Sequence, residues 1–461
     1  MDSLLSSPSW PFAVLLLGIV AIVLMITRFK FHPFVALILA SIFVGLISPE
    51  LPLEGLSQNA AANPILASIE HTMKSFGNLA GGIAWVIALA AIIGTAMMES
   101  GAAERIVNGL LSTMGEKRAP AALLISGFVL SIPVFFDTVF FLLIPLAIAL
   151  ASKTGKNYVL YVCAIAGGAV ITHAMVPPTP GPLVVSEQLG IELGITMMAG
   201  LGFGILPALG IAFLSKRLNQ KLDIPIRVAV PSADSNVKPP SFFLSMMPIL
   251  LPIVLIAMAS IIKLSTGSLP SILAFLGDKN IAMGLGTAIA LWLWAKQKGL
   301  SSKSIWEFSL KPLEIAGVII LITAAGGAFG SMIKLSGIGS AIEAATENFS
   351  IHYLLLAWFI AAVMKTAQGS STVAMITAAS IMLSLVGDGS ALPYHMVYVF
   401  LAIGFGSGFI SWMNDSGFWV VSKMSGFTEK EALQTWTVVL ATFSLIGLVQ
   451  VMLFSYVLPF K

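Results

Sequence analysis

The chain has 461 residues, of which 57% are hydrophobic and only 10% are charged. Soluble domains carry about 25% charged residues, so this composition excludes an ordinary soluble protein and is typical of an all-α polytopic membrane protein. The net charge of +3 gives no reason to expect a nucleic-acid partner, and a single cysteine, Cys163, excludes an intrachain disulfide, while no group of residues has metal-ligand spacing.

Apolar runs close to the ~20 residues that cross a bilayer as a helix recur along the chain. The first two, about 11–27 and 33–48, are joined by a basic turn, which the positive-inside rule assigns to the cytoplasm. The acidic stretch over 50–78 is then predicted to be an external loop. A third span over 79–98 returns to the inner face, where 102–118 are predicted to lie on the membrane surface.

Residues 119–152 are too many for one span and too few for two, and basic residues flank both ends. We therefore predict a re-entrant hairpin that enters from the cytoplasmic side, with its tip near Asp137. The next helix is predicted to break at 172–182, THAMVPPTPGP, because its four prolines remove amide donors and disfavour helix before them. Non-helical backbone survives at membrane depth only where protein or a water-filled cavity covers it, so we expect a functional site here.

The second half of the chain repeats this plan. We predict a first repeat over 1–215, a basic cytoplasmic linker over 216–241, and a second repeat of inverted topology over 242–461. In the second repeat, the hairpin at 351–386 enters from the external side and the helix breaks at 411–418. Each repeat is predicted to hold five transmembrane helices and one hairpin, and both chain termini are expected to be external. Broken helices at corresponding places of two inverted halves are typical of a secondary transporter.

The candidate site residues gather at the two hairpin tips and the two breaks. Asp137, Asp415 and His173 are the candidate proton carriers, because an intramembrane carboxylate must be paired, protonated or hydrated and a histidine titrates near neutral pH. Each also has a structural interpretation, as a hydrogen-bond acceptor, a helix cap or a buried neutral imidazole. Exposed amides and hydroxyls at helix starts can bind a carboxylate and its neighbouring hydroxyls. The candidate substrate-binding residues are Thr138, His173, Thr179, Gly369, Ser370, Ser371, Thr372, Asn414 and Ser416.

Lys365 is the main cation within the apolar segments. Its ammonium could attract a substrate carboxylate. A lysine at this depth can equally reach the interface with its long side chain or pair with an aspartate, and we expect one of these two roles.

Three segments of the chain are distinctive: VPPTPGP after His173, GSSTVAMITAAS over 369–380 and NDSGFWVV over 414–421. They resemble the gluconate:proton symporter family, also called the gluconate permease (GntP) family, and the resemblance extends over nearly the whole chain. It implies a member of the ion-transporter superfamily, with a scaffold, a mobile transport domain, an elevator motion and a homodimeric assembly in the bacterial inner membrane. It also implies proton-coupled uptake of gluconate or a related small hydroxylated carboxylate, with D-serine and other sugar acids carried by other members. Thr179 stands where a second histidine is expected in better-known members, which leaves the substrate open.

Other functions remain to be weighed. In a sodium-coupled organic anion carrier, Ser370, Asn414 and Asp415 would bind the ion. A channel needs a continuous polar pore, whereas the few charges here gather at the breaks. An intramembrane enzyme needs a motif such as HExxH, which is absent. We therefore expect a transporter rather than an enzyme, with a proton or sodium as coupling ion and no other cofactor.

Overall fold

The computed structural model describes residues 10–49, 51–222, 224–228, 240–266, 268–337, 341 and 352–460. Both chain ends and most of the predicted linker after Lys221 therefore lie outside the described residues. Within these residues the chain is helical without strands, and seven helices are long and apolar enough to cross a membrane. The prediction of an all-α polytopic membrane protein is confirmed.

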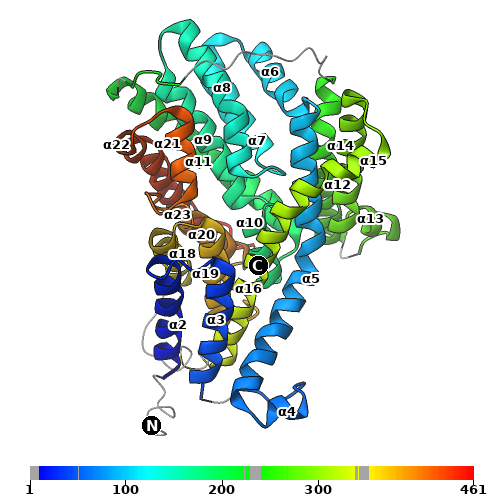
Figure 1. Ribbon diagram of the computed structural model, residues 1–461, viewed down its shortest axis with the longest axis vertical. Helices are drawn as coiled ribbons and strands as arrows, with labels where there is room; N and C mark the ends of the chain where they lie inside the picture. The colour runs from blue at the N-terminus through cyan, green and yellow to red at the C-terminus, as the bar shows by residue number, and fades with distance from the viewer. Residues whose placement is uncertain are drawn as a thin grey trace.

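A very long helix, α5, runs along much of the molecule's long axis (Figure 1). The helices of this first part are α2 (Trp10–Thr27), α3 (Pro33–Ile47), the short α4 (Gln58–Ala61) and α5 (Pro64–Glu99). The external loop predicted over 50–78 is wrong for most of its length, because α5 begins at Pro64. Asn63 caps the start by accepting from the amides of the next turn, and Glu70 pairs with Lys74 one turn later. Polar residues that suggested a loop therefore support a helix.

The first hairpin consists of two helices joined by a short turn at 131–135. This part of the chain comprises α6 (Ala102–Met114), a 3-10 turn (Glu116–Arg118), α7 (Ala119–Leu130), α8 (Phe136–Thr154), α9 (Tyr158–Met175), α10 (Pro180–Gln188) and α11 (Leu193–Lys221). Helix α9 packs on α7, α8 and α11. The contact with α7 is so close that a Cβ at Gly168 would lie 2.0 Å from the carbonyl oxygen of Leu124. The hairpin therefore packs tightly against α9, the helix that leads to the first break.

The second half also contains a hairpin, formed by the packed helices α18 and α19. Its elements are α12 (Phe242–Thr266), α13 (Ser271–Leu276), α14 (Lys279–Lys298), α15 (Ser302–Phe308), α16 (Leu310–Leu335), α18 (Tyr353–Gln368), α19 (Ser371–Val386), α20 (Val397–Gly406), α21 (Ser416–Ser425), α22 (Glu429–Ala432), a π-helical turn (Leu433–Thr437) and α23 (Val438–Val457). Helix α16 packs on α3 and α5 on one side and on α19 on the other. It thus joins the N-terminal helices to the second hairpin.

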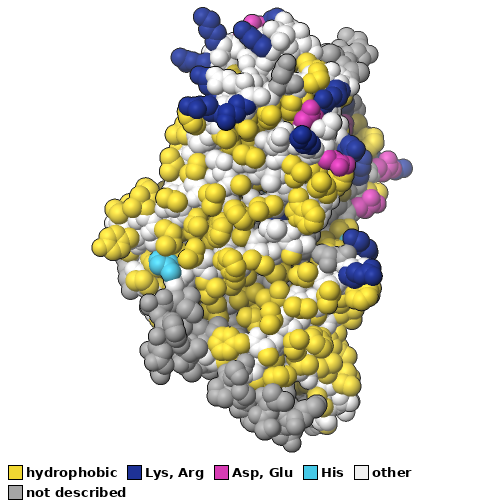
Figure 2. All heavy atoms as spheres, turned by 90° about the vertical axis from the view of Figure 1, so that its left-hand side faces the viewer, with side chains coloured by type: hydrophobic (Ala, Val, Ile, Leu, Met, Phe, Trp, Pro, Cys, Tyr) yellow, Lys and Arg dark blue, Asp and Glu magenta, His cyan; other side chains and the backbone are white. Residues whose placement is uncertain are grey.

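The surface has the pattern of a bilayer-spanning protein. Figure 2 shows hydrophobic side chains over the middle of the molecule and Lys and Arg gathered toward its upper end. Large apolar side chains such as Leu16, Leu209 and Val449 are more than half exposed. A contiguous apolar belt of this kind marks the surface that faces lipid.

Candidate functional site

Five helices begin at the wall of one cavity of about 430 Å³. The cavity is lined by the first residues of α3 (Pro33), α8 (Phe136), α10 (Pro180), α19 (Ser371) and α21 (Ser416). The first amides of a helix have no partner within the helix, and its N-terminus carries a partial positive charge. Helix starts that meet at one cavity favour a bound anion.

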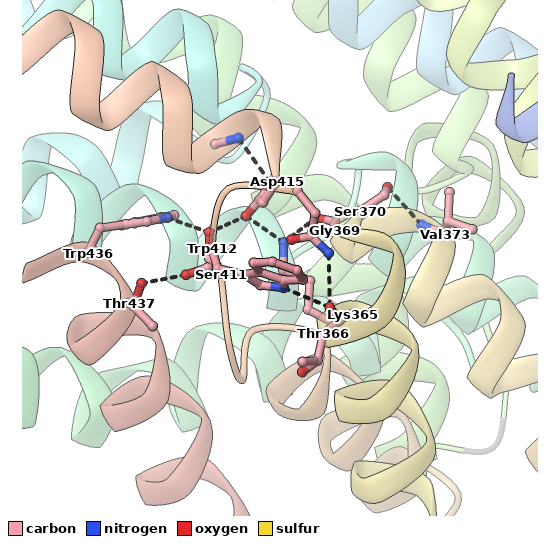
Figure 3. Close-up of polar contacts among 12 residues, drawn as sticks. Lys365, Thr366, Gly369, Ser370, Val373, Ser411, Trp412, Asp415, Trp436 and Thr437 are labelled. Carbon is pink, nitrogen blue, oxygen red and sulfur yellow. Dashed lines mark hydrogen bonds and ion pairs between the residues drawn. The ribbon is translucent and has the colours of Figure 1, made fainter. Parts of the chain in front are cut away.

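A buried ion pair forms the centre of the polar network beside this cavity (Figure 3). The Nζ of Lys365, in the last turn of α18, lies 2.7 Å from Oδ2 of Asp415 and 2.5 Å from the carbonyl oxygen of Gly369. The two charged side chains are only 2% and 8% exposed. Of the two roles expected for Lys365, pairing with an aspartate is confirmed. The pair joins the tip of the second hairpin to the start of α21.

Asp415 also accepts hydrogen bonds from residues close to it in the sequence. It is the N-cap of α21, since its Oδ1 accepts from the amide of Gly417 at 3.0 Å, and its Oδ2 accepts from the hydroxyl of Ser411. Ser411 in turn accepts from the indole of Trp436 at 2.8 Å, and its carbonyl accepts from the hydroxyl of Thr437. Trp436 and Thr437 belong to the π-helical turn, a feature common at functional sites.

The hairpin tip and the second break touch through their backbones. Gly369 has a φ of +84°, and a Cβ there would lie 2.2 Å from the carbonyl oxygen of Asn414. Asn414 donates from Nδ2 to the carbonyl of Thr366 at 2.9 Å, and the indole of Trp412 donates to the same oxygen at 2.8 Å. These bonds satisfy a carbonyl that the end of α18 leaves without an intrahelical partner. Only glycine fits at the tip.

We expect Gly369→Ala to reduce both stability and transport. A left-handed residue with a side chain costs about 1–2 kcal/mol, and the contact with Asn414 adds a steric cost. Gly299→Ala is the matched control, because Gly299 also has a positive φ (+63°) but a Cβ there meets nothing within 4 Å. Thermal unfolding of both variants measures the difference, and equal destabilisation would show that the close approach at Gly369 is unimportant.

Most of the residues predicted from the sequence come together in the cavity wall, although their roles there stay predictions. Those that line it are Asp137, Thr138, His173, Ser370, Ser371, Thr372, Asp415 and Ser416. Thr179, Gly369 and Asn414 lie outside the lining. The hydroxyl of Thr179 is buried and donates to the carbonyl of Val176 at 2.6 Å, within the turn that joins α9 to α10. Gly369 and Asn414 instead connect the tip of the second hairpin to the helix break at 411–418.

Two polar side chains in the lining have unused bonding capacity. The carboxylate of Asp137, in the first turn of α8, is partly exposed to the cavity and has no hydrogen-bond or ion-pair partner among the described residues. The Nδ1 of His173, on α9, is buried and also has no hydrogen-bond partner among the described residues. Buried polar atoms are normally satisfied, and an unsatisfied one calls for an explanation such as a bound water or ligand.

Two further residues that line the cavity are not marked by any local sequence signal. Thr323 of α16 lines the cavity with a buried, unpartnered hydroxyl, and Trp436 lines it while bonding to Ser411. Both residues lie within apolar helices away from any proline or glycine break, so no local signal marks them. Lys365 did have a signal, since a cation in an apolar helix requires a partner.

A helical membrane protein with a cavity at helix breaks, lined in part by charged and hydroxyl side chains, has the features of a membrane transporter. The family model described as "GntP family permease" matches residues 10–457. The chain therefore belongs to the GntP family of permeases, as the resemblance of its motifs predicted, and it is a transporter rather than an enzyme.

Relatives and a solved structure agree with this assignment. A gluconate permease from Pseudomonas aeruginosa is 31% identical, over 96% of this chain and 97% of the relative. The D-serine transporter DsdX of Escherichia coli is 32% identical, over 98% of this chain and all of the relative. The structure of Neisseria gonorrhoeae MtrF, described as illuminating a class of antimetabolite efflux pumps, superposes with a TM-score of 0.66 over 95% of this chain and 98% of that chain. Its identity is 14%, so this likeness concerns the fold alone.

Proposed function

We propose that this permease is a proton-coupled importer of gluconate or a related small hydroxylated carboxylate in the bacterial inner membrane. The observation that carries the proposal is the meeting of five helix N-termini at a cavity that also holds Asp137, a carboxylate without a partner among the described residues. The helix ends favour an anion, and the carboxylate can take a proton. Relatives named for gluconate and D-serine support a substrate with a carboxylate next to polar substituents.

In this proposal the substrate carboxylate binds the start of α19. The amides of Ser371 and Thr372 are among the first of the helix and have no carbonyl partner one turn earlier. The hydroxyls of Ser371, Thr372 and Thr138 line the same cavity and can bond to the substrate's own hydroxyl groups. Because no arginine lines the cavity within the described residues, anion recognition rests on helix ends, hydroxyls and Lys365.

Asp137 is proposed to carry the coupled proton, with His173 beside it in the lining. Asp415 is also a candidate on sequence grounds, but its carboxylate pairs with Lys365 and accepts two further hydrogen bonds. The carboxylate of Asp137 has no such partner among the described residues, so the proposal assigns the proton to Asp137.

We further propose the inverted repeat, with breaks at 172–182 and 411–418, and an elevator motion of the hairpins and broken helices against the remaining helices. The helix ends at 175 and 406 and the restarts at 180 and 416 support the repeat. A homodimeric assembly and the elevator motion are carried over from the family resemblance. The cytoplasmic side is assigned to the basic end in Figure 2 by the positive-inside rule, with both termini external.

Uptake into proteoliposomes tests this proposal. With acidic medium outside and no sodium, labelled gluconate should accumulate, and unlabelled gluconate should compete with it in a saturable way. Uptake that needs a sodium gradient and ignores the pH gradient would show a sodium-coupled carrier instead. Thermal unfolding with gluconate, other sugar acids and D-serine identifies the substrate, because only a ligand that binds the native state raises stability with its concentration.

A further inference from the structure

The ammonium group of Lys365 lies among oxygens that would otherwise suit a metal cation. Its contacts are the carboxylate of Asp415 and the carbonyl of Gly369. Asn414, which touches the same hairpin tip, has a buried Oδ1 with no partner among the described residues. Secondary transporters hold sodium with backbone carbonyls and side-chain oxygens at broken helices, and a hairpin tip facing a broken helix provides them here.

We propose that Lys365 is the resident cation of this site and that it makes transport independent of sodium. The inference rests on the proposed function, since it explains which ion the carrier uses. It assigns Lys365 as the residue that determines ion specificity.

Charge balance is the first argument. Among the described residues, Asp415 is the one carboxylate in direct contact with the ammonium, and both side chains are almost fully buried. The pair is therefore neutral, and a sodium ion added beside it would face a second positive charge in a poorly solvated place. Sodium could enter only if the lysine left.

The lysine is held so that it cannot easily leave. It lies one turn before Gly369, whose amide donates to the carbonyl of Lys365 at 2.8 Å and so closes the end of α18. A cation at the end of a helix is favoured by the carbonyls there. Its side chain is 2% exposed and makes two hydrogen bonds within this turn and to α21. Retracting it would leave Asp415 buried and unpaired.

The third N–H of the ammonium connects this cation with the substrate. An ammonium has three donors, and two of them are taken by Asp415 and Gly369. Lys365 also lines the cavity, together with the titratable groups Asp137, His173 and Asp415. The remaining N–H can therefore reach a bound carboxylate, a task that sodium performs in a sodium-coupled carrier. Asp137 is left free for the proton.

Sodium binding to the wild-type protein is the first experiment. Thermal unfolding of the purified protein is measured without substrate, in sodium chloride and in choline chloride of equal concentration. We expect the same unfolding temperature in both salts. A saturable upward shift in sodium would overturn the inference, whatever the outcome of the gluconate uptake assay, because this readout needs no substrate.

Two variants of Lys365 then distinguish the effect of its positive charge from the effect of the volume that its side chain fills. Lys365→Ala removes the ammonium and opens room beside Asp415, so we expect a saturable, sodium-specific rise of a few degrees in its unfolding temperature. Lys365→Met removes the charge but fills much of the room with an apolar chain, so sodium should have little effect. A folded Lys365→Ala variant that is indifferent to sodium would contradict the proposal. If neither variant folds, the wild-type measurement alone decides.

Discussion

Replacing Lys365 by methionine is expected to destabilise the protein by about 3–5 kcal/mol, which is the cost of removing one partner from a buried ion pair. The ammonium supplies the only cationic contact of Asp415 among the described residues. Without it, a carboxylate that is 8% exposed must stay charged in a poorly solvated site or take up a proton. Chemical unfolding in sodium-free detergent solution measures the effect.

The double variant Lys365→Met/Asp415→Asn should recover a large part of this loss. It removes both charges, and the asparagine Oδ1 can still accept from the amide of Gly417, while its Nδ2, in place of the second carboxylate oxygen, can donate to the hydroxyl of Ser411. Lys153→Met is the control for a lost lysine, because Lys153 pairs with Glu116 where both side chains are about two-thirds exposed. Such surface pairs contribute little. Equal unfolding free energies for Lys365→Met and Lys153→Met would refute the structural importance of the buried pair.

Asp137→Asn is expected to reduce proton-driven uptake to the level of protein-free liposomes. The carboxylate lies in the first turn of α8 at the cavity and is the proposed proton carrier. An amide of nearly the same shape can still form hydrogen bonds but cannot bind and release a proton. Substrate should still raise the thermal stability of this variant, because the helix ends and hydroxyls that bind it remain.

Exchange of labelled for unlabelled substrate at equal pH on both sides distinguishes coupling from general damage. This exchange needs no net proton movement, so Asp137→Asn should retain it while losing accumulation. Glu54→Gln is the matched control, since it neutralises an exposed carboxylate in the segment between α3 and α4. Full pH-dependent accumulation by Asp137→Asn would remove this residue as the proton carrier and leave His173 as the candidate.

Local signals in the sequence were sufficient for the class of protein and for the neighbourhood of the site. Apolar runs predicted spans, since a bilayer accepts only backbone that satisfies its own hydrogen bonds. Prolines at 177–182 and the small polar residues at 369–372 marked places where a helix ends. The structure has helix ends at Met175 and Gln368. The same kind of signal failed at 64–78, where polar residues lie on a helix instead of a loop.

Which polar groups meet was decided by the tertiary structure. Lys365 and Asp415 are 50 positions apart, and nothing local in either segment specifies the other as its partner. Thr179 lies in the most conspicuous motif, but packing turns its hydroxyl toward the carbonyl of Val176 and away from the cavity lining.

The sequence by itself determined that this is a helical membrane permease of the GntP family, and it predicted a site at interrupted helices. Composition and helix-breaking residues act over one or two turns, so they can be read without knowing the fold. Only the tertiary structure decided that five helix starts share one cavity, that Lys365 pairs with Asp415, and that Asp137 has no partner among the described residues. Those outcomes depend on contacts between distant segments, which arise when the helices pack.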